Sequence, residues 1–179
     1  MAKTKTLDEA VDKIFKNYKT AIKNAAKEAT EQAKDDLYTH AISCLVQYYD
    51  DYNPTSYSRS YHLIDCFVPY AKPVREVGDE IICVAGVEFD PSKIEGVYHG
   101  SSTYSDTDAE WIIANFLSGI HPRTDGSREI GGGDYEAQKE YGSFVPSYEM
   151  QKYTERYRNI FYDNLRFALS KSVLKLTTK

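Results

Sequence analysis

The chain has 179 residues, enough for one hydrophobic core with a helical extension. Hydrophobic residues make up 41% of the chain and aromatic residues 13%, which excludes wholesale disorder. The net charge is −5, and residues 37–122 carry four basic against twelve acidic side chains. Because phosphate binding needs a basic face, this balance argues against direct sequence-specific nucleic-acid binding.

A membrane partner is not expected either. No apolar run approaches the roughly 20 residues that cross a bilayer, and the start, MAKTKTLDEA, lacks the apolar region of a signal peptide. The three cysteines, Cys44, Cys66 and Cys83, lie in apolar surroundings without the close spacing of a zinc site. We therefore predict reduced, buried thiols in a protein made in the cytosol.

Residues 7–50 have the period of a long amphipathic helix, with apolar positions three or four apart from Leu7 to Tyr48. We assign residues 1–36 to a helical extension and residues 37–179 to a single α+β domain. The middle of the stripe consists of alanines, which bury little area by themselves. Two interpretations stay open here: a partner chain covers the stripe, or the helix frays at its lysine-rich start.

The stretch from Gln47 to Leu63, QYYDDYNPTSYSRSYHL, predicts a corner. Asn53-Pro54 favours a turn, so the helix should end near Tyr52. Tyrosines at such a junction bury their rings and keep their hydroxyls hydrogen-bonded. We interpret them as packing residues in preference to residues that recognise a partner. The corner residues that we single out are Tyr52, Pro54, Tyr57, Arg59 and Tyr61.

The middle of the chain predicts strands. Residues 61–68 alternate and suggest an extended segment, and Pro69 and Pro73 then bracket a piece expected to be irregular. Residues 80–89, EIICVAGVEF, form the strongest strand pattern, although periodicity alone does not exclude a short buried helix. We expect a further extended piece around residues 94–98 to pair with it.

A compact helix should follow, beginning after Asp106 or Thr107 as N-cap and ending at Gly119, with Trp111 packing it on the sheet. Residues 121–147 predict a long flexible loop that contains Gly131, Gly132 and Gly133. No Gly-Lys-Ser/Thr follows these glycines, which argues against a phosphate-binding loop. We interpret the loop as a hinge or docking segment and its three glycines as candidate interface residues.

The last element should be an amphipathic helix from about Ser147 to Leu174. It mixes tyrosine with arginine, as interface cores do, and Tyr153, Arg156 and Tyr157 are our candidate interface residues. Arginines that extend over an aromatic core give the same pattern, so that alternative stays open.

Catalytic patterns are weak. The four histidines have no metal-binding spacing, and only His121, with Arg123 and Asp125 in the long loop, forms an acid–base candidate. We predict no catalytic, cofactor-binding or metal-binding residues and no enzyme. A small hydrolase or transferase with its site around His121 is the alternative of another class.

A resemblance to a known class of proteins rests on two stretches. The corner fits an aromatic-Tyr-x-Pro-x-x-Tyr-x-Arg-Ser/Thr pattern with Tyr52, Pro54, Tyr57, Arg59 and Ser60 in its positions. Together with Asn115–Arg123, NFLSGIHPR, it resembles small structural proteins of tailed bacteriophages, closest to the tail-completion or head–tail joining class of neck proteins. The resemblance covers about a sixth of the chain, and the N-terminal helix is longer than this class implies.

The expected fold is α+β: a long N-terminal helix, a small mainly antiparallel sheet with a short packing helix, a long loop and a C-terminal amphipathic helix. The resemblance implies a non-enzymatic virion protein, present in the host cytoplasm during assembly. It would form a ring with copies of itself and contact portal, adaptor or tail proteins. A minor capsid protein, or an adaptor that binds another virion or host protein, is the alternative.

Overall fold

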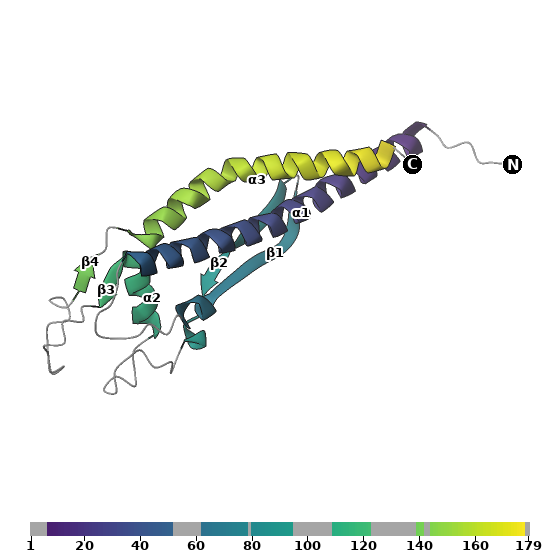
Figure 1. Ribbon diagram of the computed structural model, residues 1–179. Coiled ribbons are helices and arrows are strands. Elements are labelled where there is room, and N and C mark those ends of the chain that lie inside the picture. Colours follow the sequence, from purple (N-terminus) through teal and green to yellow (C-terminus); the bar gives the residue numbers. More distant parts are fainter. Residues whose placement is uncertain are drawn as a thin grey trace, which may run out of the picture. The chain divides into compact units, whose positions relative to one another are not determined.

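The computed structural model describes residues 7–51, 62–78, 80–94, 109–122, 139–141 and 144–177. Its elements confirm the α+β class: two long helices, a short helix and small sheets (Figure 1). The predicted corner residues, the N-cap candidates Asp106 and Thr107, and the three glycines of the loop lie outside these ranges.

Helix α1 covers Leu7–Asp50, 44 residues, the range that its period predicted; the structure shows that it is uninterrupted, which the sequence had left open. The sequence explains this length, because no glycine or proline occurs between residues 7 and 50. Helix α3 covers Pro146–Thr177 and confirms the predicted C-terminal helix, with proline in the first turn where its missing N–H costs nothing.

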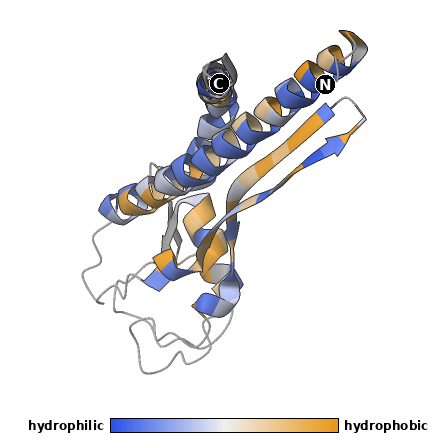
Figure 2. Ribbon diagram, turned by 90° about the vertical axis from the view of Figure 1, so that its right-hand side faces the viewer, coloured by the Kyte–Doolittle hydropathy of each residue, from blue (hydrophilic) through white to orange (hydrophobic). Residues whose placement is uncertain are grey.

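Strands β1 (Phe67–Val77) and β2 (Glu80–Phe89) form a two-stranded sheet, and the bounds of β2 are those expected. The connection is two residues long, which only antiparallel strands allow, and Gly78 takes a φ of 62° in it. Figure 2 shows hydrophobic residues along most of one strand of this hairpin and in the short helix, whereas the other strand and the long helices carry both kinds of residue.

The region before β2 differs from the prediction. Residues 62–66 form a short 3₁₀ helix, η1 (His62–Cys66), and the segment around Pro69 and Pro73 is not irregular but part of β1. Each strand of a two-stranded sheet has an edge without a ladder partner, so β1 accommodates two prolines. The partner of β2 is β1, and Ile94 closes the turn η2 (Pro91–Lys93) instead of starting a strand; the rest of the piece expected around residues 94–98 lies outside the described residues.

Helix α2 (Ala109–Ser118) ends at Gly119, as predicted. Gly119 has a φ of 66° and its N–H donates to the Phe116 carbonyl oxygen at 3.0 Å. A Cβ at this position would collide with the Phe144 carbonyl oxygen, so both the conformation and the space require glycine.

The expected loop 121–147 is shorter at both ends than predicted. Strand β3 (Ile120–Pro122) pairs antiparallel with β4 (Lys139–Tyr141), and Ile120 lies opposite Tyr141. Backbone pairing of two short strands gives little sequence signal when each has only three residues.

The chain divides into two compact units. Unit 1 comprises Met1–Asp35, Tyr70–Gly86 and Arg156–Lys179, and unit 2 comprises Asp36–Pro69 and Val87–Glu155. Unit 1 contains the outer part of the hairpin and most of α3 besides the start of α1. The division into an extension, residues 1–36, and a single domain, residues 37–179, stays a prediction.

Unit 2 contains the larger hydrophobic core, centred on Phe116 of α2. The Phe116 ring is fully buried and meets the rings of Tyr48 at 5.3 Å, Phe67 at 5.6 Å and Phe89 at 6.3 Å between centroids. Tyr48 approaches it edge-on, at an interplanar angle of 89°, the geometry that aromatic quadrupoles favour. α1, β1, β2 and α2 thus meet around one side chain.

Unit 1 packs closely because its part of α1 is rich in alanine. The buried side chains here are Ala21, Ala25, Ala26, Ala29, Thr30 and Ala33. At 100° per residue they spread over about half of the helix circumference. Ion pairs tie this segment to its neighbours: Lys19 and Lys23 reach Glu76 of β1 at 3.5 and 2.9 Å, and Lys171 of α3 reaches Glu28 at 3.5 Å.

Candidate functional site

Only some of the candidate residues predicted from the sequence lie within the part of the chain that the structure describes. The corner residues Tyr52, Pro54, Tyr57, Arg59 and Tyr61, and Gly131, Gly132 and Gly133, lie outside the described residues. His121 is described only as a backbone position of β3, and Arg123 and Asp125 are outside the described ranges. Only Tyr153, Arg156 and Tyr157 are placed with their side chains.

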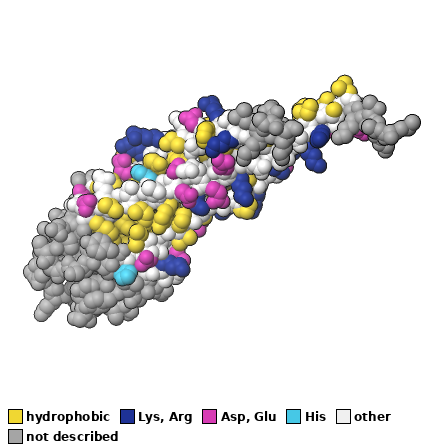
Figure 3. Space-filling view, turned by 45° about the vertical axis from the view of Figure 1, so that its right-hand side comes forward, with side chains coloured by type: hydrophobic (Ala, Val, Ile, Leu, Met, Phe, Trp, Pro, Cys, Tyr) yellow, Lys and Arg dark blue, Asp and Glu magenta, His cyan; other side chains and the backbone are white. Residues whose placement is uncertain are grey.

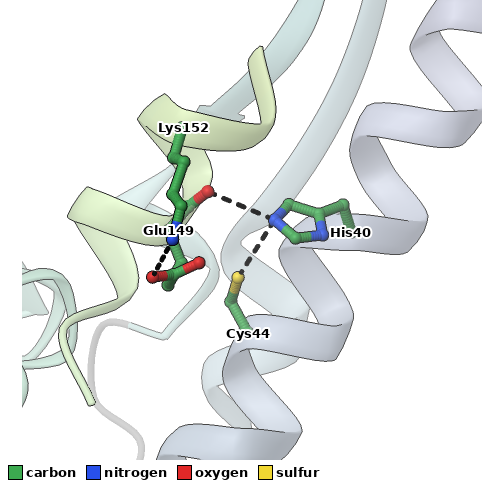
Figure 4. Close-up of polar contacts among 4 residues, drawn as sticks. All are labelled: His40, Cys44, Glu149 and Lys152. Atoms are coloured by element: carbon green, nitrogen blue, oxygen red, sulfur yellow. Dashed lines mark hydrogen bonds and ion pairs between the residues drawn. The ribbon is translucent and has the colours of Figure 1, made fainter. Parts of the chain in front are cut away.

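Tyr153 packs within unit 2. Its ring stacks on the imidazole of His40 with centroids 3.8 Å apart and 13° between the planes. The His40 Nε2 atom lies 3.4 Å from the carbonyl oxygen of Glu149, one turn earlier on α3, and 3.6 Å from Cys44 Sγ (Figure 4). A proton on Nε2 lets this imidazole donate to the Glu149 carbonyl oxygen.

The neighbouring Cys44 does not have the electrostatics of a nucleophilic thiol. Its side chain is 2% exposed, and burial, followed by the negative charge of Glu149, raises the pKa of the thiol to about 11. A catalytic cysteine needs the opposite shift and access to substrate. We conclude that His40, Cys44 and Tyr153 pack and orient the junction of α1 with α3 in unit 2.

The other two interface candidates, Tyr157 and Arg156, differ in exposure. Tyr157 is 4% exposed and receives a hydrogen bond on its hydroxyl from Asn164 Nδ2 at 3.5 Å, so its ring serves packing in unit 1. Arg156 is exposed. Of the three, Arg156 is the exposed one, whereas Tyr153 is half-buried and Tyr157 is buried.

Two kinds of arrangement are absent from the described residues. No group of three or more His, Cys, Asp or Glu side chains there has a metal-binding arrangement. Within the same ranges, no helix is both long and apolar enough to span a bilayer.

The most unusual surface is the start of α1. We define the overhang as residues 7–18; its exposed apolar side chains are Leu7 (80% exposed), Val11 (39%), Ile14 (67%), Phe15 (69%) and Tyr18 (49%). Every residue from 11 to 20 is exposed, and the next residue, Ala21, is buried. Figure 3 shows hydrophobic side chains gathered at this end of the helix.

The ion pairs show where the elements beside α1 end, and the overhang extends beyond that point. In unit 1, α3 runs antiparallel to α1 (Figure 1), and Lys171, six residues before the end of α3, pairs with Glu28, 21 residues after the start of α1. At 1.5 Å per residue, α1 continues about 20 Å past the end of α3. Glu76 lies two residues before the turn at Gly78 and pairs with Lys19 and Lys23, so the hairpin ends there too.

A second uncovered apolar surface lies on the part of α1 that belongs to unit 2. We define the groove as the depression of about 470 Å³ lined by Tyr38, Thr39, Ile42, Ser43, Val46, Gln47 and Asp50. Val46, one of these residues, is 53% exposed. The seven residues that line it lie on one face of α1, so the depression is shallow and open to solvent.

Periodicity revealed the overhang stripe but not its exposure. The same three-or-four spacing runs through Val11, Ala25 and Leu45, although the first is exposed and the other two are buried. The signal in the sequence is the change from large apolar residues to alanine at position 21. Alanine suits close packing against neighbouring elements, and the large side chains before it mark where that packing ends. The groove gave no comparable signal.

Comparison with known proteins gives no relative: no protein-family model matches the chain, and neither curated proteins nor solved structures show a significant similarity to it.

Proposed function

We propose that this chain is a non-enzymatic structural protein of a tailed-bacteriophage virion, a head–tail connector or tail-completion subunit that assembles into a ring. In this role it contacts copies of itself and the portal, adaptor or tail proteins next to it. It resides in the virion, and in the host cytoplasm during assembly. The phage origin rests on the resemblance of the corner and of residues 115–123 to neck proteins.

The observation that carries the assembly role is the overhang. Five large apolar side chains on about three helical turns face solvent, at exposures from 39% to 80%. Contiguous exposed apolar surface of this kind marks protein–protein contact sites. A subunit that functions by being covered by its neighbours has a reason to keep such a surface.

The experiment uses the phage that encodes the chain, with a nonsense codon in its gene. We expect lysates in which filled heads and tails accumulate unjoined, and immunogold label at the neck of wild-type particles. Normal virions from the nonsense mutant, without the protein, would refute the proposal. Label over the capsid surface would favour the minor-capsid alternative.

A further inference from the structure

We draw no further inference here: the strongest candidate, the exposed apolar face of α1 over residues 7–18, carries nothing beyond the proposed assembly role, because nothing in the structure shows what covers it.

Discussion

Replacing Phe116 with alanine tests whether the core of unit 2 is organised around this ring. The ring is fully buried and has three aromatic neighbours within 6.3 Å, from α1, β1 and β2. Buried Phe→Ala substitutions cost about 3–5 kcal/mol, and we expect about 4 kcal/mol here because close packing on several sides prevents collapse of the cavity. That is a large fraction of the roughly 5–15 kcal/mol that stabilises a typical domain.

The assay is urea denaturation followed by circular dichroism, with Phe167→Ala as the matched control. Phe167 is 62% exposed and has the Lys171 ammonium over its ring at 4.1 Å. The control should lose less than about 1 kcal/mol, which is the size of an exposed cation–π contact. A Phe116→Ala variant no less stable than the control would refute the placement of the core.

The remaining predictions concern unit 1 and the titrating groups. Ala25 is 0% exposed, so Ala25→Leu should lower the free energy of unfolding by about 1–3 kcal/mol through overpacking, measured by thermal melts against Asn24→Leu at an exposed position. Burial raises the pKa of the Cys44 and Cys66 thiols from 9.0 to about 11, so iodoacetamide at pH 8 should modify Cys83 faster than either; equal rates would contradict their burial. Because both pKa values are higher in the folded state, the thiols add stability below pH 9 that is lost as the pH rises towards 11. The hydrogen bond from Lys23, and then the charge of Lys19, lower the pKa of Glu76. The contribution of this carboxylate to stability should therefore be present at neutral pH and fall as it is protonated below its ordinary pKa of 4.5. Glu76→Gln should remove that part of the acid dependence of unfolding, and an unchanged acid titration would count against these ion pairs.

The sequence predicted the elements whose signals are local and repeated. The 44 residues of α1 contain a full apolar period and no helix-breaking residue, and Gly119 marked the end of α2. Residues 80–89 showed a strand because isoleucine and valine favour a half-buried pleated surface.

What the sequence did not show depends on contacts between distant residues. Pro69 and Pro73 suggested an irregular segment, since a proline cannot donate a hydrogen bond to a neighbouring strand. Whether a strand has an edge without a neighbour, where proline is tolerated, depends on the sheet and cannot be read from the residue itself. Tyr153 and Tyr157 have similar neighbours in sequence, yet one stacks on His40 and the other is buried in unit 1. The overhang was visible as a stripe, but its exposure follows from where α3 and the hairpin end.

The central claim is that this chain functions by association through the exposed apolar faces of α1. Its most direct test is the mass of the wild-type protein in sedimentation velocity over a wide concentration range, since one chain has a mass of 20.4 kDa. The account predicts a mass that rises with concentration towards a discrete oligomer and returns to one chain on substitution of Ile14 by glutamate. A mass of one chain at every concentration would contradict it.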